Sequence, residues 1–517
     1  MKQVYKQWIA VVLTTAALTA CNLDTQPTTS LDAGSVFNKA EDAEKIITGT
    51  WSYLLETFNS YRCPGYASFL LAGDAMGSDV AGGNGKYGPT RDNYNFGSSG
   101  VYAKGYYNSF SWTLSYAVIN NMNGIIAYID DAAGAQADRN RIKGQALALR
   151  GFIYLHLASY YSFAIDKDPD AVSVSIYTEP SDAATEGKPA ASVSEVYAQS
   201  IADLEGALAL IPENYIRTAK WKIDTQVVLG LLSRATLYAR QWEKAKNYSE
   251  RLLTKNNYLM GEEEYKAGFN SVDNKEWIWG HPQTPEQSNA SYTFHYWDTT
   301  TSGSYYYSYN LDPHFLDNFD DNDYRKSIIY WDVDPGTDRA AVNGFVWLRY
   351  AKFKFREDFT ADIVLLRTAE VYLINAEAKA RLGEADAAAT LNALKAARNA
   401  TQVSASLSDQ ELISAIWLER RKELWGEGFA LADIIRNQQA VERRAWDETT
   451  LVDFTYTDDQ GEEQTVKKFQ KGHSTFRFPD GTDFAPNSKY YLYRITDGEE
   501  TENSNLYTLH PKLEIYN

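Results

Sequence analysis

The chain has 517 residues and a formal net charge of −18 at pH 7. An acidic surface repels phosphates, so nucleic-acid binding by the surface as a whole is excluded. With 44% hydrophobic residues there is ample material for a core, and two cysteines are too few for a disulfide framework.

The first 20 residues predict a secretory signal peptide. Two lysines precede an apolar core at about 8–17, which is too short to span a bilayer as a helix. The following Leu-Thr-Ala-Cys run ends at Cys21 and resembles a bacterial lipobox, in which the thiol takes a diacylglycerol. We therefore expect lipidation of Cys21, the alternative being an ordinary secretory signal with a chance cysteine. The second cysteine, Cys63, then stands alone and is expected to be a small buried residue rather than a nucleophile.

The rest of the chain predicts a tether followed by a single domain. Residues 21–34 are polar and read as a flexible tether. The domain, 35–517, divides into a helical scaffold at about 35–255 and 361–436, a ligand-loop insertion at about 256–360, and a loop-rich C-terminal part at 437–517.

Helices are predicted where apolar residues recur at three- and four-residue spacing. These segments are, in chain order, about 42–55, 112–126, 137–163, 192–211, 224–239, 242–252, a pair within 363–398, and 408–425. Ser192 with Glu195, and Ser408 with Glu411, form capping boxes at two of the starts. Short helices joined by tight turns are tetratricopeptide-like, and we expect an all-α fold with about four such pairs. Short strands, such as 464–469 and 490–493, are expected in the loop-like tail from about 440.

Motifs for catalysis or for metal binding are largely missing. The sequence contains no His-Glu-x-x-His, Gly-x-Ser-x-Gly or Walker motif. The run Asp317, Asn318, Asp320, Asp321, Asn322, Asp323 offers oxygen ligands for calcium, but its spacing differs from an EF-hand and favours turn and capping roles. We expect no cofactor, or at most a structural calcium ion.

Aromatic residues gather in the insertion, where they occupy 15 of the 55 positions between 277 and 331, against 14% of the whole chain. Sugar rings pack their C–H faces on aromatic faces, so the run predicts a glycan site. The alternative is a local core, and we expect most of the rings to be core. Candidate ligand-binding residues are the hydrogen-bonding Asp74, Asp79 and Arg349, and the stacking residues Trp279, Tyr296, Trp297, Tyr306 and Tyr307.

An ordered set of segments resembles the SusD/RagB family of Bacteroidetes outer-membrane lipoproteins. The matching segments are Leu365–Ala378, Glu419–Gly428 with Asp433 and Arg436, Trp112–Asn123, Ala148–Tyr154, Val193–Leu204, Asp323-x-Arg325, and Lys352. One departure is Ala430, where the family usually has an arginine, and we expect a local change in ion pairing there.

The resemblance implies a non-enzymatic glycan receptor, anchored at the outer membrane and facing outward, that passes oligosaccharides to a TonB-dependent transporter. It implies that helix pairs form a scaffold, that loops carry the ligand site, and that the signature arginines and glutamates are mostly buried ion pairs and helix caps. Three alternatives stay open: a peptide-binding RagB-like receptor, a surface glycosidase with two carboxylates facing a cleft, and a purely structural partner of the transporter.

Overall fold

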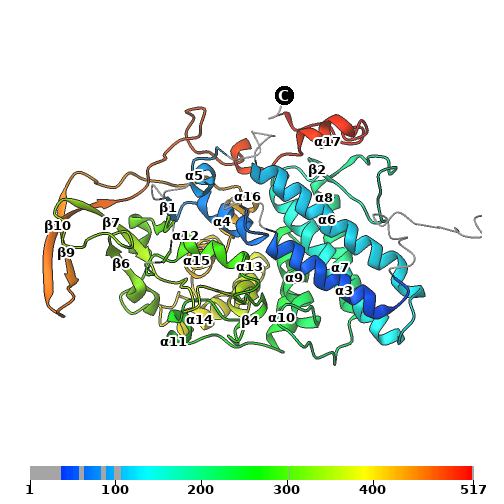
Figure 1. The fold of residues 1–517 in the computed structure, drawn as a ribbon, viewed down its shortest axis with the longest axis horizontal. Coiled ribbons are helices and arrows are strands. Elements are labelled where there is room, and N and C mark those ends of the chain that lie inside the picture. Colours follow the sequence, from blue (N-terminus) through cyan, green and yellow to red (C-terminus); the bar gives the residue numbers. More distant parts are fainter. Residues whose placement is uncertain are drawn as a thin grey trace, which may run out of the picture.

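The computed structural model describes residues 37–57, 63–82, 89–97, 106–301, 303–304 and 306–514. The predicted signal peptide, Cys21 and the tether lie outside the described residues. Figure 1 shows long helices packed side by side in one half of the molecule and most of the strands at the other end, where the β9–β10 hairpin projects outward.

Helices dominate the described part of the chain, as the periodicity predicts. They are α3 (Ala40–Glu56), α4 (Ala67–Ala75), α5 (Pro89–Tyr94), α6 (Tyr106–Tyr128), α7 (Gln136–Tyr160), α8 (Val193–Leu210), α9 (Thr225–Tyr238), α10 (Trp242–Leu253), α11 (Glu262–Lys266), α12 (Phe294–Trp297), α13 (Thr368–Arg381), α14 (Ala387–Ala397), α15 (Asp409–Glu423), α16 (Ala430–Arg436) and α17 (Asp497–Glu502). Consecutive helices pack as neighbours: α6 on α7, α7 on α8, α9 on α10, and α13 on α14. None of these described helices is both long and apolar enough to cross a membrane.

Both predicted capping boxes are present. The Ser192 hydroxyl accepts from the Glu195 backbone N–H at 3.2 Å, and the Glu195 carboxylate accepts from the Ser192 N–H at 2.8 Å. Ser408 and Glu411 make the same reciprocal pair at the start of α15. Each box satisfies amides that a helix start leaves without an intrahelical partner.

Strands make the all-α prediction too narrow. They are β1 (Val80–Gly82), β2 (Val172–Ser175), β3 (Ala190–Ser192), β4 (Trp277–His281), β5 (Tyr309–Leu311), β6 (Ile329–Asp332), β7 (Gly344–Tyr350), β8 (Ile363–Arg367), β9 (Leu451–Thr457) and β10 (Glu463–Lys471). A four-stranded sheet has the order β6-β7-β10-β9, in which only the β7–β10 pair is parallel.

Three local predictions differ from the structure. Residues 363–367, taken as the start of a helix, form β8 because they pair with β4. Residues 490–493, predicted as a strand, begin instead with a 3₁₀ turn that Ser488 caps. The segment 73–100, predicted as loop, contains the end of α4, β1 and α5.

A buried ionic network joins β4 and β8 to α15. Glu423 accepts hydrogen bonds from Arg325 at 2.8 Å, from Arg367 at 2.6 Å and from Arg398 at 2.8 and 3.0 Å. Glu276, the residue directly before β4, accepts hydrogen bonds from both Arg367 and Arg398. These side chains are at most 1% exposed, so the signature residues tie distant elements together inside the protein.

The aspartate-rich run at 317–323 is used for turns and ion pairs. Asp323 accepts from the Arg325 backbone N–H, Asp320 from the Thr401 N–H, and Asp321 pairs with Lys326 at 2.7 Å. Within the described ranges, no group of three or more His, Cys, Asp or Glu residues is placed to hold a metal ion.

Candidate functional site

A cluster of aromatic rings surrounds α12, and it contains four of the predicted stacking residues. Tyr296 stacks on Tyr306 at a centroid distance of 4.6 Å, and Trp297 stacks on Phe353 at 4.6 Å. Tyr296, Trp297 and Tyr306 are at most 4% exposed. Their rings therefore form an inner layer. The fourth predicted residue, Tyr307, is half-buried, and its backbone N–H donates to the His295 carbonyl at 2.8 Å.

An outer layer of rings reaches the surface, and we name Tyr292, Tyr307 and Phe359 the aromatic patch. Phe359 is 48% exposed, and the other two are half-buried. The centroid of the Phe359 ring lies 5.7 Å from that of Phe355. A Cβ built on Gly303 would lie 2.3 Å from the Phe359 ring, so this ring packs directly against the glycine backbone. Tyr292 meets the inner layer through a 2.8 Å hydrogen bond between its hydroxyl and that of Tyr306.

Two residues of the patch have an unusual backbone. Tyr307 has φ +26° and Phe359 has φ +57°, in the region that bulky residues rarely adopt. Such conformations cost free energy and persist where surrounding structure enforces them, often at ligand sites. The pattern of apolar residues gives no signal for Phe359, although the charged run Arg356-Glu357-Asp358 before it indicates a surface loop.

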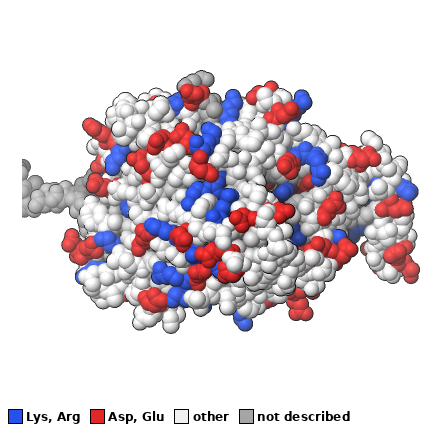
Figure 2. Space-filling view, turned by 180° about the vertical axis from the view of Figure 1, so that it is seen from behind, with Lys and Arg blue, Asp and Glu red and all other residues white. Residues whose placement is uncertain are grey.

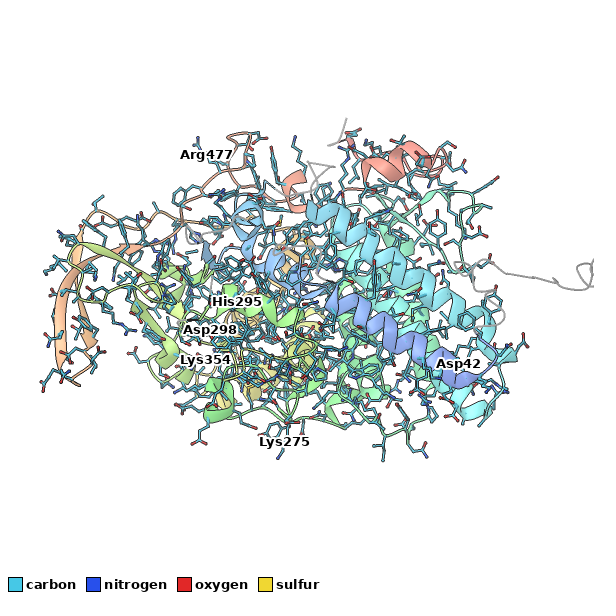
Figure 3. All side chains as sticks on the ribbon, viewed as in Figure 1. Asp42, Lys275, His295, Asp298, Lys354 and Arg477 are labelled. Atoms are coloured by element: carbon cyan, nitrogen blue, oxygen red, sulfur yellow. The ribbon has the colours of Figure 1, made fainter. Side chains whose placement is uncertain are left out.

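Buried polar groups hold the loops of the patch in place. The Asp298 carboxylate accepts from the backbone N–H groups of Thr300 at 2.8 Å, Thr301 at 3.1 Å and Phe355 at 3.0 Å. Burial lowers the pKa of His295 to about 4, so its ring is neutral at physiological pH. Figure 3 labels His295, which lies on α12, and Asp298, which directly follows that helix.

Two other predicted residues lie away from the patch and are fully buried. Trp279 on β4 packs edge-on against Trp51 at 5.2 Å and Phe152 at 5.0 Å, and its indole N–H donates to the Trp221 carbonyl. Arg349 on β7 donates to Asn310 and to Asp334. Neither side chain exposes a surface to solvent, so both serve packing in this conformation.

The predicted Asp74 and Asp79 come together in a third place, a pocket of about 210 Å³ between β1, α15 and α16. Asp79 makes a bidentate ion pair with Arg421 at 2.6 and 2.9 Å. Asp74 accepts from the backbone N–H groups of Gly428 at 3.0 Å and Ala430 at 3.2 Å. Ala430 carries no charged side chain and meets Asp74 only through its backbone N–H.

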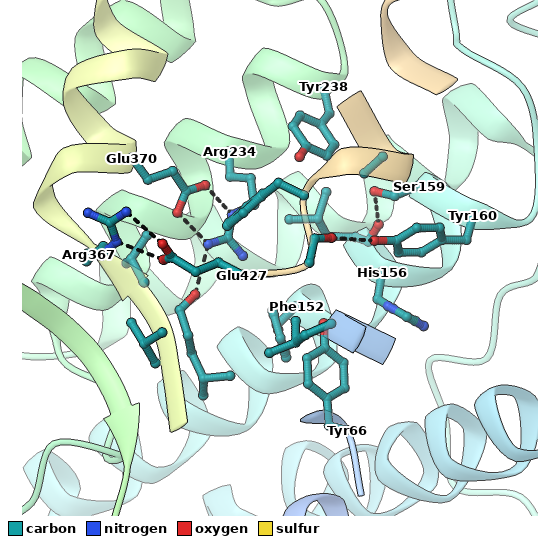
Figure 4. Close-up of a pocket in the computed structure, with 18 residues that line it drawn as sticks. Tyr66, Phe152, His156, Ser159, Tyr160, Arg234, Tyr238, Arg367, Glu370 and Glu427 are labelled. Atoms are coloured by element: carbon teal, nitrogen blue, oxygen red, sulfur yellow. Dashed lines mark hydrogen bonds and ion pairs between the residues drawn. The ribbon is translucent and has the colours of Figure 1, made fainter. Parts of the chain in front are cut away.

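A fourth place, shown in Figure 4, is an interior cavity of about 60 Å³. Its wall contains two buried ion pairs, Arg234 with Glu370 at 2.6 Å and Arg367 with Glu427 at 2.7 Å. A benzene-sized molecule needs roughly 150 Å³, so this cavity admits water but no sugar ring.

The charged residues on the surface do not favour a ligand of one particular charge. In Figure 2, Lys and Arg are interspersed with Asp and Glu across the face seen from behind. Electrostatic steering of a strongly charged ligand to this face is therefore not favoured.

Two family models match the chain. The model described as "SusD family" matches residues 295–511, and one described as "Starch-binding associating with outer membrane" matches 75–237. No match was found among the curated proteins.

Solved structures extend the likeness over nearly the whole chain. A SusD-like carbohydrate binding protein from Bacteroides vulgatus is 62% identical, with a TM-score of 0.89 over 93% of this chain and 100% of that chain. A SusD superfamily protein from Bacteroides thetaiotaomicron is 25% identical, with a TM-score of 0.66 over 79% of this chain and 91% of that one. A Bacteroides fragilis member, 18% identical with a TM-score of 0.67 over 91% and 100% of the two chains, shares the fold. The chain therefore belongs to the SusD family, as its helical segments indicate.

Proposed function

We propose that this protein is a non-catalytic glycan receptor of the outer-membrane surface and that the aromatic patch is its ligand site. The observation that carries the proposal is the exposed Phe359 ring, which packs on the buried Phe355, together with Tyr292, whose hydroxyl is hydrogen-bonded to the buried Tyr306. The carbohydrate-binding relative at 62% identity and the starch-binding family description support the ligand class.

The patch suits a sugar because its rings are fixed before the ligand arrives. Stacking of one ring contributes roughly 0.5–1.5 kcal/mol beyond area burial, so a useful affinity needs two or three rings. Rings held by Tyr306, Phe355 and the glycine backbone lose little entropy on binding. Asp298 supports three loop amides, which makes it a frame for the loop rather than a catalytic acid.

The proposal also covers how the protein is anchored to the membrane and how it delivers its ligand. Lipid on Cys21 and a tether at 21–34 would hold the single domain, 35–517, beside a TonB-dependent transporter, and acyl chains contribute about 0.8 kcal/mol per buried methylene. The helix pairs would act as a tetratricopeptide-like scaffold that carries the loops. A Cys21→Ala strain that loses glycan uptake, while the purified variant keeps normal glycan affinity, would support separate roles for the anchor and the ligand site.

The test of the ligand class is isothermal titration calorimetry against panels of oligosaccharides and peptides. The proposal predicts binding of at least one glycan and a several-fold loss in Phe359→Ala. The matched control is Phe345→Ala, since that phenylalanine is 50% exposed but lies on β7. Binding of peptides alone would favour the RagB-like alternative, and release of reducing ends from a bound glycan would favour a glycosidase.

A further inference from the structure

A further pocket lies between α6, the loop that follows β2, and α17, away from the β9–β10 hairpin (Figure 1). Its volume of about 250 Å³ exceeds the roughly 150 Å³ that accommodates a benzene-sized molecule. The pocket opens to solvent beside Asp182, which is exposed. Aromatic rings and carboxylates share its wall, and none of its residues belongs to the aromatic patch.

Three half-buried aromatic rings line the pocket and meet at steep angles. The ring centroids of Trp112 and Tyr116 are 4.6 Å apart with their planes at 45°, and Tyr116 meets Tyr177 edge-on at 6.0 Å and 85°. The Tyr116 hydroxyl donates to the Ser175 carbonyl at 2.8 Å. The Tyr177 hydroxyl accepts from the Lys188 backbone N–H at 3.0 Å, so both tyrosines are fixed at their far ends. Rings at these angles form a corner, which suits a compact, rounded group better than the flat face of a sugar ring.

Two carboxylates on the same wall lack a positively charged partner. Oε1 of Glu499 accepts from the Asn503 amide at 2.8 Å. Oδ1 of Asp182 accepts from the Ala184 backbone N–H at 2.9 Å and from the Thr185 hydroxyl at 3.1 Å. Within the part of the chain that the structure describes, no Lys, Arg or His forms an ion pair with either carboxylate. The second oxygen of each carboxylate therefore stays available to a donor.

An ammonium group already lies on one of the rings. Nζ of Lys188, which does not itself line the pocket, is 5.4 Å from the centroid of Tyr177, within the roughly 6 Å of a cation–π contact. Burial raises the pKa of Tyr116 and Tyr177, and the charge of Glu499 adds to this shift, so that carboxylate lies near both hydroxyls. The wall thus combines negative charge with electron-rich ring faces, and both attract a cation.

We propose that this pocket binds an organic ammonium ion. The positive group would lie in the corner of the three rings, with Glu499 as its counterion and Asp182 at the mouth. A free amine and the end of a lysine side chain on another polypeptide both offer this group, and the experiment below separates the two sources. The net charge of −18 favours the approach of either cation.

The test is isothermal titration calorimetry of the folded, full-length protein with choline as the probe. Its neutral isostere, 3,3-dimethylbutan-1-ol, has the same shape with a carbon atom in place of the charged nitrogen. We expect choline to bind at least about tenfold more tightly than the isostere, because the two differ only in charge. Nα-acetyl-lysine amide is titrated in parallel, and tighter binding of this compound than of choline would identify a lysine side chain as the source.

Two variants and a control sharpen the test. Glu499→Gln removes the charge but keeps an oxygen for the Asn503 amide, and it should weaken choline binding by about tenfold. Tyr177→Leu removes one ring and should weaken binding by a similar factor. The matched control is Glu502→Gln, which removes an exposed carboxylate from the same helix but outside the pocket, and affinity should stay within about twofold. Thermal denaturation checks folding, and if Tyr177→Leu does not fold, Glu499→Gln carries the test.

Four results would overturn the proposal. Equal affinities for choline and its neutral isostere would show that the pocket recognises shape alone. Absence of heat and of thermal stabilisation with both choline and the lysine amide would exclude the ligand class. A neutral monosaccharide that binds more tightly than choline, and is lost in Glu499→Gln, would assign the pocket to a sugar. Choline binding should be unchanged in Phe359→Ala, and its loss there would place choline on the aromatic patch instead.

Discussion

Replacement of Glu423 by glutamine is expected to destabilise the protein strongly. This carboxylate accepts four hydrogen bonds at 2.6–3.0 Å from three arginines, and all four side chains are at most 1% exposed. Glutamine keeps the shape but removes the charge, so Arg325, Arg367 and Arg398 lose a common counterion. Breaking a buried ion pair by changing one partner costs about 3–5 kcal/mol, which is a large fraction of a typical unfolding free energy.

The assay is urea denaturation followed by fluorescence, with the midpoint and the slope m compared between variants. We expect a lower midpoint and an unchanged m. The matched control is Glu213→Gln, which removes an exposed ion pair with Lys255 and should leave the midpoint almost unchanged. A Glu423→Gln midpoint equal to that of the control would refute the view that the signature residues are structural.

Three further predictions concern the aromatic patch, Asp74 and Cys21. Tyr292→Phe removes the 2.8 Å hydrogen bond to Tyr306 and should weaken glycan binding by less than Phe359→Ala does, as calorimetry would show; an equal loss would argue that the hydroxyl contacts the sugar. The folded-state pKa of Asp74, about 7, lies above its unfolded value of 3.8, so folding takes up a proton at any pH between these two values. The stability of the wild type relative to Asp74→Asn, measured by thermal melts, should therefore fall as the pH rises from about 4 to 7. A difference in stability that does not change with pH would contradict the raised pKa. Cys21→Ala should move the protein from the membrane fraction to the soluble fraction in cell fractionation, and retention in the membrane would argue against the lipid anchor.

The helical scaffold could be predicted from the sequence because its signals are local. The three- and four-residue spacing of apolar residues and the capping boxes locate α8 and α15. Ser192 and Ser408 accept hydrogen bonds from backbone amides at the starts of these helices. The strand β8 could not be predicted, because the apolar residues of 363–367 fit a helix or a buried strand equally well until β4 is known to pair with them.

The aromatic run indicates where rings concentrate, but not which of them reach the surface. Exposure depends on partners far away in the chain: Trp279 is buried because Trp51 and Phe152 pack on it. Conversely, Phe359 is exposed because its loop turns back over Gly303 with a positive φ, and no periodicity encodes that turn. Local patterns therefore locate the aromatic-rich loops, and tertiary packing decides which of their residues face solvent.

The central claim, that a glycan stacks on the aromatic patch, is tested most directly by a crystal structure with the oligosaccharide that binds best in the calorimetric panel. The account predicts a sugar ring on the face of Phe359, with Tyr292 or Tyr307 beside it. A glycan bound instead on the β7 face near Phe345, or in the pocket of Asp74, with the aromatic patch left bare, would contradict it.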